Sequence, residues 1–129
     1  MRPLEKRSFR GLLVWQQAMS LVKDCYFLTK RLPREELYGL TSQIRRAAVS
    51  VPANIAEGSG RSTKRDYVNF LRIAQGSLRE LETYLILIVE IDLVTPEVTA
   101  PILSQVESIA RLLNRLIQSL LTDRPPLTA

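Results

Sequence analysis

The 129-residue chain is long enough for one domain with its own hydrophobic core, and too short for two domains of ordinary size. It has no histidine and one cysteine, Cys25, which excludes an intramolecular disulfide and every histidine-dependent catalytic or metal site. The net charge of +5 comes from residues 1–34, which hold eight Lys and Arg against two Asp and Glu, whereas residues 35–129 carry −1. A net charge of this size is, by itself, a weak indication of nucleic-acid binding.

Residues 1–11, MRPLEKRSFRG, have little apolar pattern, and we interpret them as a basic N-terminal arm for which Phe9 is a candidate anchor. From Leu12 to Leu32, apolar residues recur every three or four positions, which predicts an amphipathic helix stopped by Pro33. Cys25 falls on the apolar side of this helix and is expected to be a buried, inert thiol. Phe27 falls on the polar side, either as a lone exposed aromatic or as a subunit contact.

The second predicted helix, YGLTSQIRRAAVSVPANIAEGSGR from Tyr38 to Arg61, has two apolar faces. The first face is expected to be core and consists of Leu40, Ile44, Ala47, Ala48, Val51 and Ile55. The second is a flank of small apolar side chains, namely Val49, Ala53 and Ala56. A helix with two apolar faces usually has two packing partners. Gly58 and Gly60 are expected to end the helix.

A polar stripe runs along the same helix, and we assign to it Gln43, Arg45, Arg46, Ser50, Asn54 and Glu57. Three interpretations stand: a solvated face with local hydrogen bonds, a subunit interface, or a ligand contact. Glu57 lies near the C-terminus of the helix, where the helix dipole disfavours a carboxylate. We therefore expect Glu57 to pair with Arg61, four residues on.

A third helix of about 30 residues is predicted next, with Ser62 or Thr63 as its N-cap. Its apolar residues follow a heptad: Tyr67, Phe70, Leu71, Ala74, Leu78, Leu81, Leu85 and Ile88. Gly76 and Ser77 interrupt it near the middle, and close approach of another helix is the expected compensation. Thr95-Pro96-Glu97 predicts the start of a fourth helix, with a capping hydroxyl, a proline at the first position and an acid in the first turn. Residues 122–129 are predicted to form a disordered tail.

Four amphipathic helices with short connections predict an all-α, antiparallel up-down-up-down four-helix bundle over residues 12–121. In that topology one end of the bundle gathers Arg2, Lys6, Arg7, Arg10, Arg61, Lys64, Arg65 and Arg124 against Glu5, Glu57, Asp66 and Asp123. The opposite end holds Lys30, Arg31 and Arg34 against Glu35, Glu36, Glu90, Asp92 and Glu97. The bundle is therefore predicted to be electrically lopsided, with one basic end.

The stretches LLVWQQA, YGLTSQIRRAAVSVPANIAEGSGR and FLRIAQGSLRELETYL closely resemble the four-helix bundle proteins encoded in intervening sequences of bacterial 23S ribosomal RNA genes. The resemblance runs from about Phe9 to Leu120. It implies a bundle that assembles as a homopentamer, with no known catalytic residues and an unsettled molecular role. The family is also similar, at the level of the fold, to the pentameric basic accessory protein of diversity-generating retroelements, which works with a reverse transcriptase and binds nucleic acid.

The sequence favours a non-catalytic oligomeric module that binds RNA or another nucleic acid electrostatically through the basic end. The expected phosphate contacts are Arg2, Lys6, Arg7, Arg10, Arg61, Lys64 and Arg65. Phe9 and Tyr67 are the aromatic residues near that end, so base-specific reading is not expected. The alternative is a structural or protein-interaction adaptor whose basic end contacts an acidic partner protein, for example a reverse transcriptase-like protein encoded nearby, without binding nucleic acid.

An enzyme, a metal site and a cofactor are not expected. Metal sites in helical bundles use inward-facing Glu with Glu-x-x-His pairs, and the chain has no histidine. GSGR at 58–61 fits a helix stop better than a phosphate-binding loop, because no strand precedes it. No charged-then-apolar leader opens the chain, and no apolar run approaches the roughly 20 residues needed to cross a membrane, so we expect a soluble, cytoplasmic protein.

Overall fold

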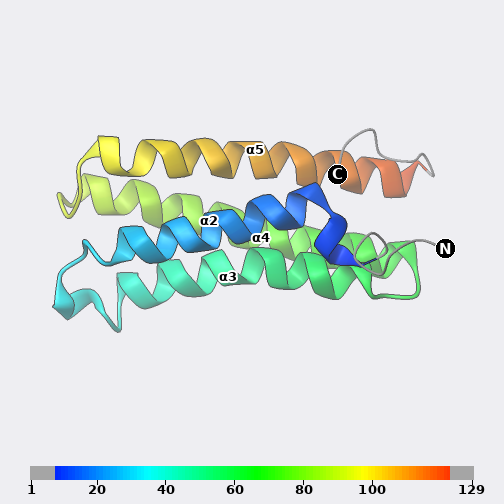
Figure 1. The fold of residues 1–129 in the computed structure, drawn as a ribbon, viewed down its shortest axis with the longest axis horizontal. Helices are drawn as coiled ribbons and strands as arrows, with labels where there is room; N and C mark the ends of the chain where they lie inside the picture. Colours follow the sequence, from blue (N-terminus) through cyan, green and yellow to red (C-terminus); the bar gives the residue numbers. More distant parts are fainter. Residues whose placement is uncertain (1–7, 123–129) are drawn as a thin grey trace.

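Four long helices make up most of the computed structural model, which describes residues 8–122 (Figure 1). They are α2 (Leu13–Thr29), α3 (Leu40–Ser59), α4 (Lys64–Glu90) and α5 (Pro96–Leu121), and two short 3-10 helices, η1 (Phe9–Gly11) and η2 (Arg34–Glu36), precede α2 and α3. Each long helix packs against the next in the chain, and α5 also contacts α2, which closes the bundle. The predicted all-α four-helix bundle is confirmed, with the antiparallel order of helices visible in Figure 1.

The core runs the length of the bundle and receives side chains from all four helices. Leu21, Ile44, Leu81 and Ile109, one from each helix, are 0% exposed. Burying an aliphatic side chain of this size stabilises the fold by roughly 1.5–3 kcal/mol relative to leaving it in water. The predicted core faces of the second and third helices are confirmed, except that Leu40, Tyr67 and Phe70 are only partly buried.

The helix starts match the sequence signals in part. Thr63 is the N-cap of α4, and its Oγ1 accepts a hydrogen bond from the Asp66 backbone N–H at 3.1 Å, as predicted. α5 begins at Pro96, also as predicted, but the Thr95 side chain makes no capping hydrogen bond. Its backbone carbonyl instead accepts from the Val98 N–H at 3.1 Å. The prediction that the Thr95 hydroxyl caps α5 was therefore wrong.

Two glycines have roles opposite to the predicted ones. Gly58 is buried inside α3, which continues to Ser59, so Gly58 does not end the helix. A Cβ added at Gly58 would lie 2.9 Å from Phe70 Cβ. Gly58 thus lets α3 approach α4, while Gly60 follows the last residue of the helix, as predicted. At Gly76 an added Cβ would meet no atom within 4 Å, so the close approach of another helix predicted for Gly76 and Ser77 is absent at Gly76. It occurs at Ser77, which is buried and whose Oγ lies 2.7 Å from Ser50 Oγ of α3.

The N-terminal part of the described chain is fixed by Phe9. The rings of Phe9 and Trp15 form an edge-to-face pair with centroids 5.1 Å apart, which supports Phe9 as the anchor of the arm. The remaining arm residues Arg2, Lys6 and Arg7, and residues 123–129 of the tail, lie outside the described residues. Within residues 8–122, no helix is both long enough and apolar enough to cross a membrane.

The thiol of Cys25 is fully buried in α2, as predicted. Burial, followed by the nearby charge of Asp24, raises the pKa of Cys25 to about 12. Because the thiolate is the reactive form, we expect native protein at neutral pH to react far more slowly than unfolded protein with a chromogenic disulfide reagent. Labelling of native protein at the unfolded rate would contradict this burial.

Folding raises the pKa of Cys25, so the protonated thiol favours the folded state. This contribution to the free energy of unfolding is complete at neutral pH and is lost as the pH rises towards about 12.

Candidate functional site

The polar stripe of α3 lies mainly along the seam between α3 and α4. Arg46 forms an ion pair with Glu80 of α4, and its Nη2 donates to Gln43 Oε1 at 3.0 Å. The hydroxyl oxygens of Ser50 and Ser77 are 2.7 Å apart and share a hydrogen bond between the helices. These contacts show that the stripe joins α3 to α4 instead of facing water alone.

Two further residues complete the stripe. The Asn54 Nδ2 donates to the Ser50 carbonyl at 2.8 Å, within α3. Glu57 pairs with Arg61 at 3.2 Å, as predicted from their spacing. The guanidinium of Arg61 also lies over the Phe70 ring, 4.6 Å from its centroid, so this end of the stripe contacts α4 as well.

The charged part of the stripe is saturated by its own partners. Tyr84 OH donates to Glu80 Oε2 at 2.8 Å, and this bond, together with Arg46, lowers the pKa of Glu80 below its usual value. Glu80 in turn raises the pKa of Arg46 and of Tyr84. Such exposed pairs contribute little to stability. Arg46, Glu80 and Tyr84 are therefore paired with one another, which favours the interpretation as local hydrogen bonding.

Arg45 does not belong to the stripe, and its assignment there was wrong. Its Nε donates to Thr29 Oγ1 at 2.9 Å, and its guanidinium lies 4.5 Å from the centre of the Tyr26 ring. Both partners are on α2. Successive helical residues point about 100° apart, so Arg45 and Arg46 reach different neighbours.

The predicted basic end is formed by the start of α2, the connection between α3 and α4, and the end of α5 (Figure 1). Arg10, Arg61, Lys64 and Arg65 are all exposed there. The other predicted contacts, Arg2, Lys6 and Arg7, lie outside the described residues. A groove of about 350 Å³ opens at this end, lined by Lys64, Arg65, Val68, Asn69, Leu120 and Leu121.

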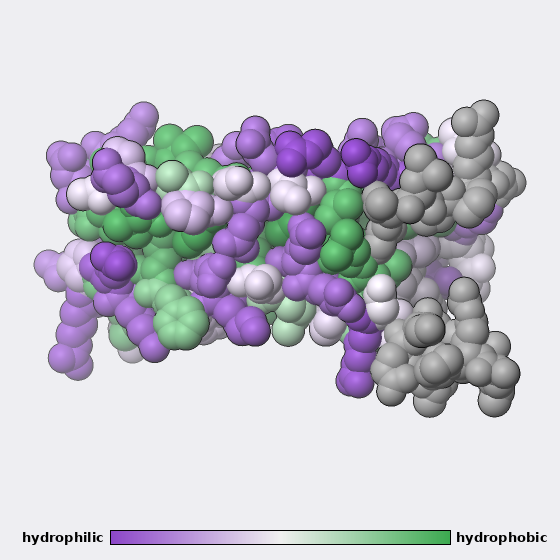
Figure 2. Space-filling view, turned by 45° about the horizontal axis from the view of Figure 1, so that its top comes forward, coloured by the Kyte–Doolittle hydropathy of each residue, from purple (hydrophilic) through white to green (hydrophobic). Residues whose placement is uncertain are grey.

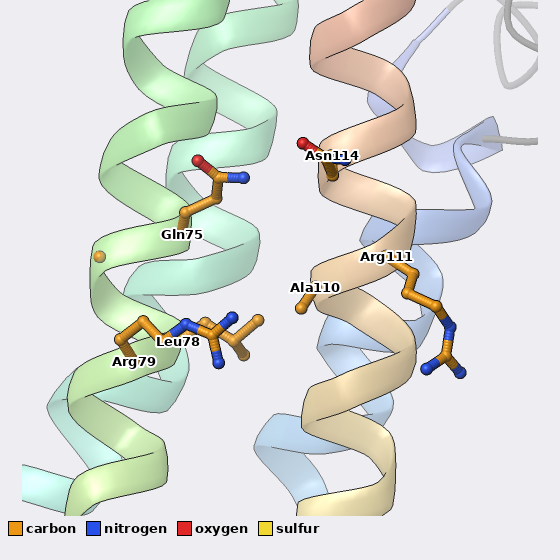
Figure 3. A pocket seen from close by; sticks show the side chains of 7 residues that line it. Gln75, Leu78, Arg79, Ala110, Arg111 and Asn114 are labelled. Carbon is orange, nitrogen blue, oxygen red and sulfur yellow. The ribbon is translucent and has the colours of Figure 1, made fainter.

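A second groove of about 550 Å³ runs between α4 and α5, lined in part by Gly76 and Leu78. Figure 3 shows Gln75 and Arg79 of α4 extending towards α5, while Arg111 points away from the groove. Arg79 is paired with Glu82 at 2.8 Å. The lining contains neither a carboxylate nor a thiol, so it offers no general acid, base or nucleophile.

A third groove, of about 310 Å³, follows the seam between α2 and α5. Polar side chains bridge it, because Gln105 Nε2 donates to Asp24 Oδ2 at 2.6 Å and Ser108 Oγ donates to Gln17 Oε1 at 3.1 Å. Figure 2 shows hydrophilic side chains across the middle of this face, with apolar side chains visible on either side. These bonds join the first and last helices of the bundle.

Comparison with known proteins identifies relatives of this bundle. A family model described as "23S rRNA-intervening sequence protein" matches residues 10–115. The chain is also similar to the crystal structure of a protein of unknown function from the S23 ribosomal protein family of Bacteroides thetaiotaomicron VPI-5482. The TM-score is 0.74 and the identity 24%, over 82% of this chain and 99% of that one, which supports the fold alone. A search among curated proteins finds no match.

Proposed function

This chain belongs to the 23S rRNA-intervening sequence protein family, and we propose that it is a non-catalytic module that binds RNA or another nucleic acid through its basic end. The observation that carries the proposal is the gathering of exposed Arg10, Arg61, Lys64 and Arg65 at one end of the bundle. Phosphate contacts of this kind supply most of the affinity in binding that does not depend on sequence.

The start of α4 adds to the attraction for phosphate. Lys64 and Arg65 occupy its first turn, where the helix dipole is positive and the first backbone N–H groups lack helical partners. Cations are disfavoured at that position, and a bound phosphate removes the repulsion while accepting from the N–H groups. Asp66 is the acid in this turn, and its own N–H is already bonded to Thr63.

The proposed module is an oligomer, with a homopentamer as the expected form. The small apolar flank of α3 supports self-association, because Val49 and Ala53 are exposed. Ile73 of α4 is 50% exposed, and it lies one turn before Ser77, which contacts Ser50 next to Val49. These apolar side chains therefore border one seam and form a surface that a second copy can cover. Several copies would multiply a modest basic patch.

We expect the variant R10Q/K64Q/R65Q to bind nucleic acid more weakly and with a flatter salt dependence. Each lost phosphate contact reduces the slope of log K against log salt by about 0.9 for duplex DNA or 0.7 for a single strand. The measurement is a titration of nuclease-treated protein with structured RNA, single-stranded RNA and duplex DNA at several salt concentrations, with the mass in solution recorded alongside.

The matched control is R72Q/R79Q/R111Q, which removes the same charge from exposed arginines of α4 and α5. For this control, the slope of log K against log salt should stay closer to that of the wild type. An unchanged slope in R10Q/K64Q/R65Q would show that the basic end is not the binding surface. No binding by the wild type, together with co-purification of a defined acidic protein, would instead support the adaptor alternative.

A further inference from the structure

Aromatic and basic side chains alternate at the end of the bundle opposite the basic end, where α2 ends and α3 begins. We call this surface the α2–α3 corner; it consists of Tyr26, Phe27, Lys30, Arg31, Arg34, Tyr38 and Arg45. Phe27 is 65% exposed and Tyr38 is 92% exposed. Single exposed apolar residues are common on protein surfaces, but their combination with cations is a feature of nucleic-acid-binding surfaces.

Two of the cations are already placed over the aromatic rings. Lys30 Nζ lies 5.0 Å from the centre of the Phe27 ring, and the Arg45 guanidinium lies 4.5 Å from that of Tyr26. Arg45 is held there by its hydrogen bond to Thr29, whose hydroxyl donates to the Tyr26 carbonyl at 3.0 Å. Flat π surfaces and positive charge therefore occur side by side on fixed helical positions.

The corner keeps an excess of positive charge, because its four cations, Lys30, Arg31, Arg34 and Arg45, outnumber the two acids of the α2–α3 connection, Glu35 and Glu36. Among residues 8–122, no carboxylate forms an ion pair with Lys30, Arg31 or Arg34. Glu36 is engaged, because its Oε1 accepts from the Leu40 N–H at 3.2 Å at the start of α3. Glu90, Asp92 and Glu97, which the order of the helices predicts at this same end, belong to the separate connection between α4 and α5 (Figure 1).

We propose that the α2–α3 corner binds the unpaired bases of a single-stranded nucleic acid. Phe27 and Tyr38 supply the stacking surfaces, and Lys30, Arg31 and Arg34 contact the adjoining phosphates. Every base has a π face, but in a duplex the neighbouring base pairs cover it, so the corner selects strands with unstacked bases. This inference rests on the proposed function and adds to it the class of nucleic acid that is bound.

The corner and the basic end are separate contacts on the same protein. They lie at opposite ends of α3, whose 20 residues span about 30 Å. Base-specific reading was not expected at the basic end, where Phe9 and Tyr67 are the aromatic residues predicted nearby. Phe27 and Tyr38, the most exposed aromatic side chains among residues 8–122, lie at the corner instead.

The test compares a labelled oligothymidylate with an abasic strand of the same length, which keeps the phosphates and removes the bases. Wild-type protein should bind the base-bearing strand about tenfold more tightly, the usual effect of stacking one base on an aromatic side chain. The variant F27L/Y38L keeps apolar side chains but removes both aromatic rings, and should bind the two strands equally. The control F27Y/Y38F keeps the rings and should retain the preference. All these side chains are exposed, so the variants should remain folded, which circular dichroism checks.

The outcomes separate this inference from the proposed function. If the wild type bound both strands with equal, salt-dependent affinity, the proposal that the α2–α3 corner binds bases would be wrong. The proposed binding at the basic end would be unaffected. Retention of the preference by F27L/Y38L would also overturn the proposal for the corner. A change in the mass of F27L/Y38L in solution would show that Phe27 or Tyr38 is a subunit contact, and would likewise overturn it. No binding to either strand would overturn the inference, and a lack of salt-dependent binding to structured RNA and duplex DNA as well would also overturn the proposed function.

Discussion

Replacing Gly58 with alanine is expected to destabilise the bundle by about 1–3 kcal/mol, the usual cost of overpacking a tight contact. The added Cβ would lie 2.9 Å from Phe70 Cβ and 3.2 Å from the Tyr67 carbonyl oxygen. Neither atom is the free end of a flexible side chain, so α3 and α4 must move apart to admit it. This cost opposes the gain of about 1 kcal/mol that alanine brings over glycine inside a helix.

The same substitution at Gly76 provides the matched control, because it is also a helix-interior glycine but has no atom within 4 Å of the added Cβ. Only the helix propensity changes there, so Gly76→Ala should stabilise the protein by about 0.5–1 kcal/mol. Both variants are measured by urea unfolding at one protein concentration, with the slope of the transition compared to that of the wild type. A shift of the same sign for both would contradict the packing described for Gly58.

Truncating Leu81 to alanine is expected to cost about 2–5 kcal/mol of unfolding free energy. Leu81 is 0% exposed on α4, the helix that contacts both α3 and α5, and its loss would leave a cavity in the core. This loss is a large fraction of the total free energy of unfolding, since single domains are stable by only about 5–15 kcal/mol. Thermal and urea unfolding should both register the change.

Ile86→Ala is the control for Leu81, because Ile86 is on the same helix but is 45% exposed. A surface substitution of this kind usually changes the free energy of unfolding by no more than about 0.5 kcal/mol. Equal effects of Leu81→Ala and Ile86→Ala would mean that α4 does not present Leu81 to the core in solution.

The fold could be predicted from the sequence because its signals are local and consistent. Apolar residues recur at helical spacing over each predicted helix, and turn or capping residues such as Thr63 and Pro96 mark where helices begin. Glu57 and Arg61 are four residues apart, so their ion pair also followed from helical geometry. Properties of this kind do not depend on which helix lies opposite.

Apart from the local capping bond at Thr95, the failed predictions concern contacts that depend on the neighbouring helix. The role of a glycine is set by the side chain placed opposite it, and Phe70 stands opposite Gly58 whereas nothing stands opposite Gly76. Arg45 and Arg46 are adjacent in sequence but reach α2 and α4 respectively. A single sequence does not specify these pairings, because they require the relative rotation and spacing of the packed helices.

The candidate sites were predictable to the same extent. The basic end followed from the order of the helices, but the engagement of Arg61 with Phe70 did not. The α2–α3 corner was missed because its cations were counted together with all the acids at that end of the bundle, of which Glu90, Asp92 and Glu97 lie on another connection. The available signal was the spacing of Phe27 and Lys30, which places an aromatic ring and a cation one turn apart on a helix.

The order of the helices also bears on how quickly the chain reaches its native state. Only residues 60–63 separate α3 from α4, and most helix pairs in contact are neighbours along the chain. Such short loops cost little entropy to close, and helical proteins rich in local contacts fold in microseconds to milliseconds. The contact between α2 and α5 is the exception, because it joins the first long helix to the last. During synthesis, α2, α3 and α4 can therefore associate before α5 is complete, with the docking of α5 as the closing step.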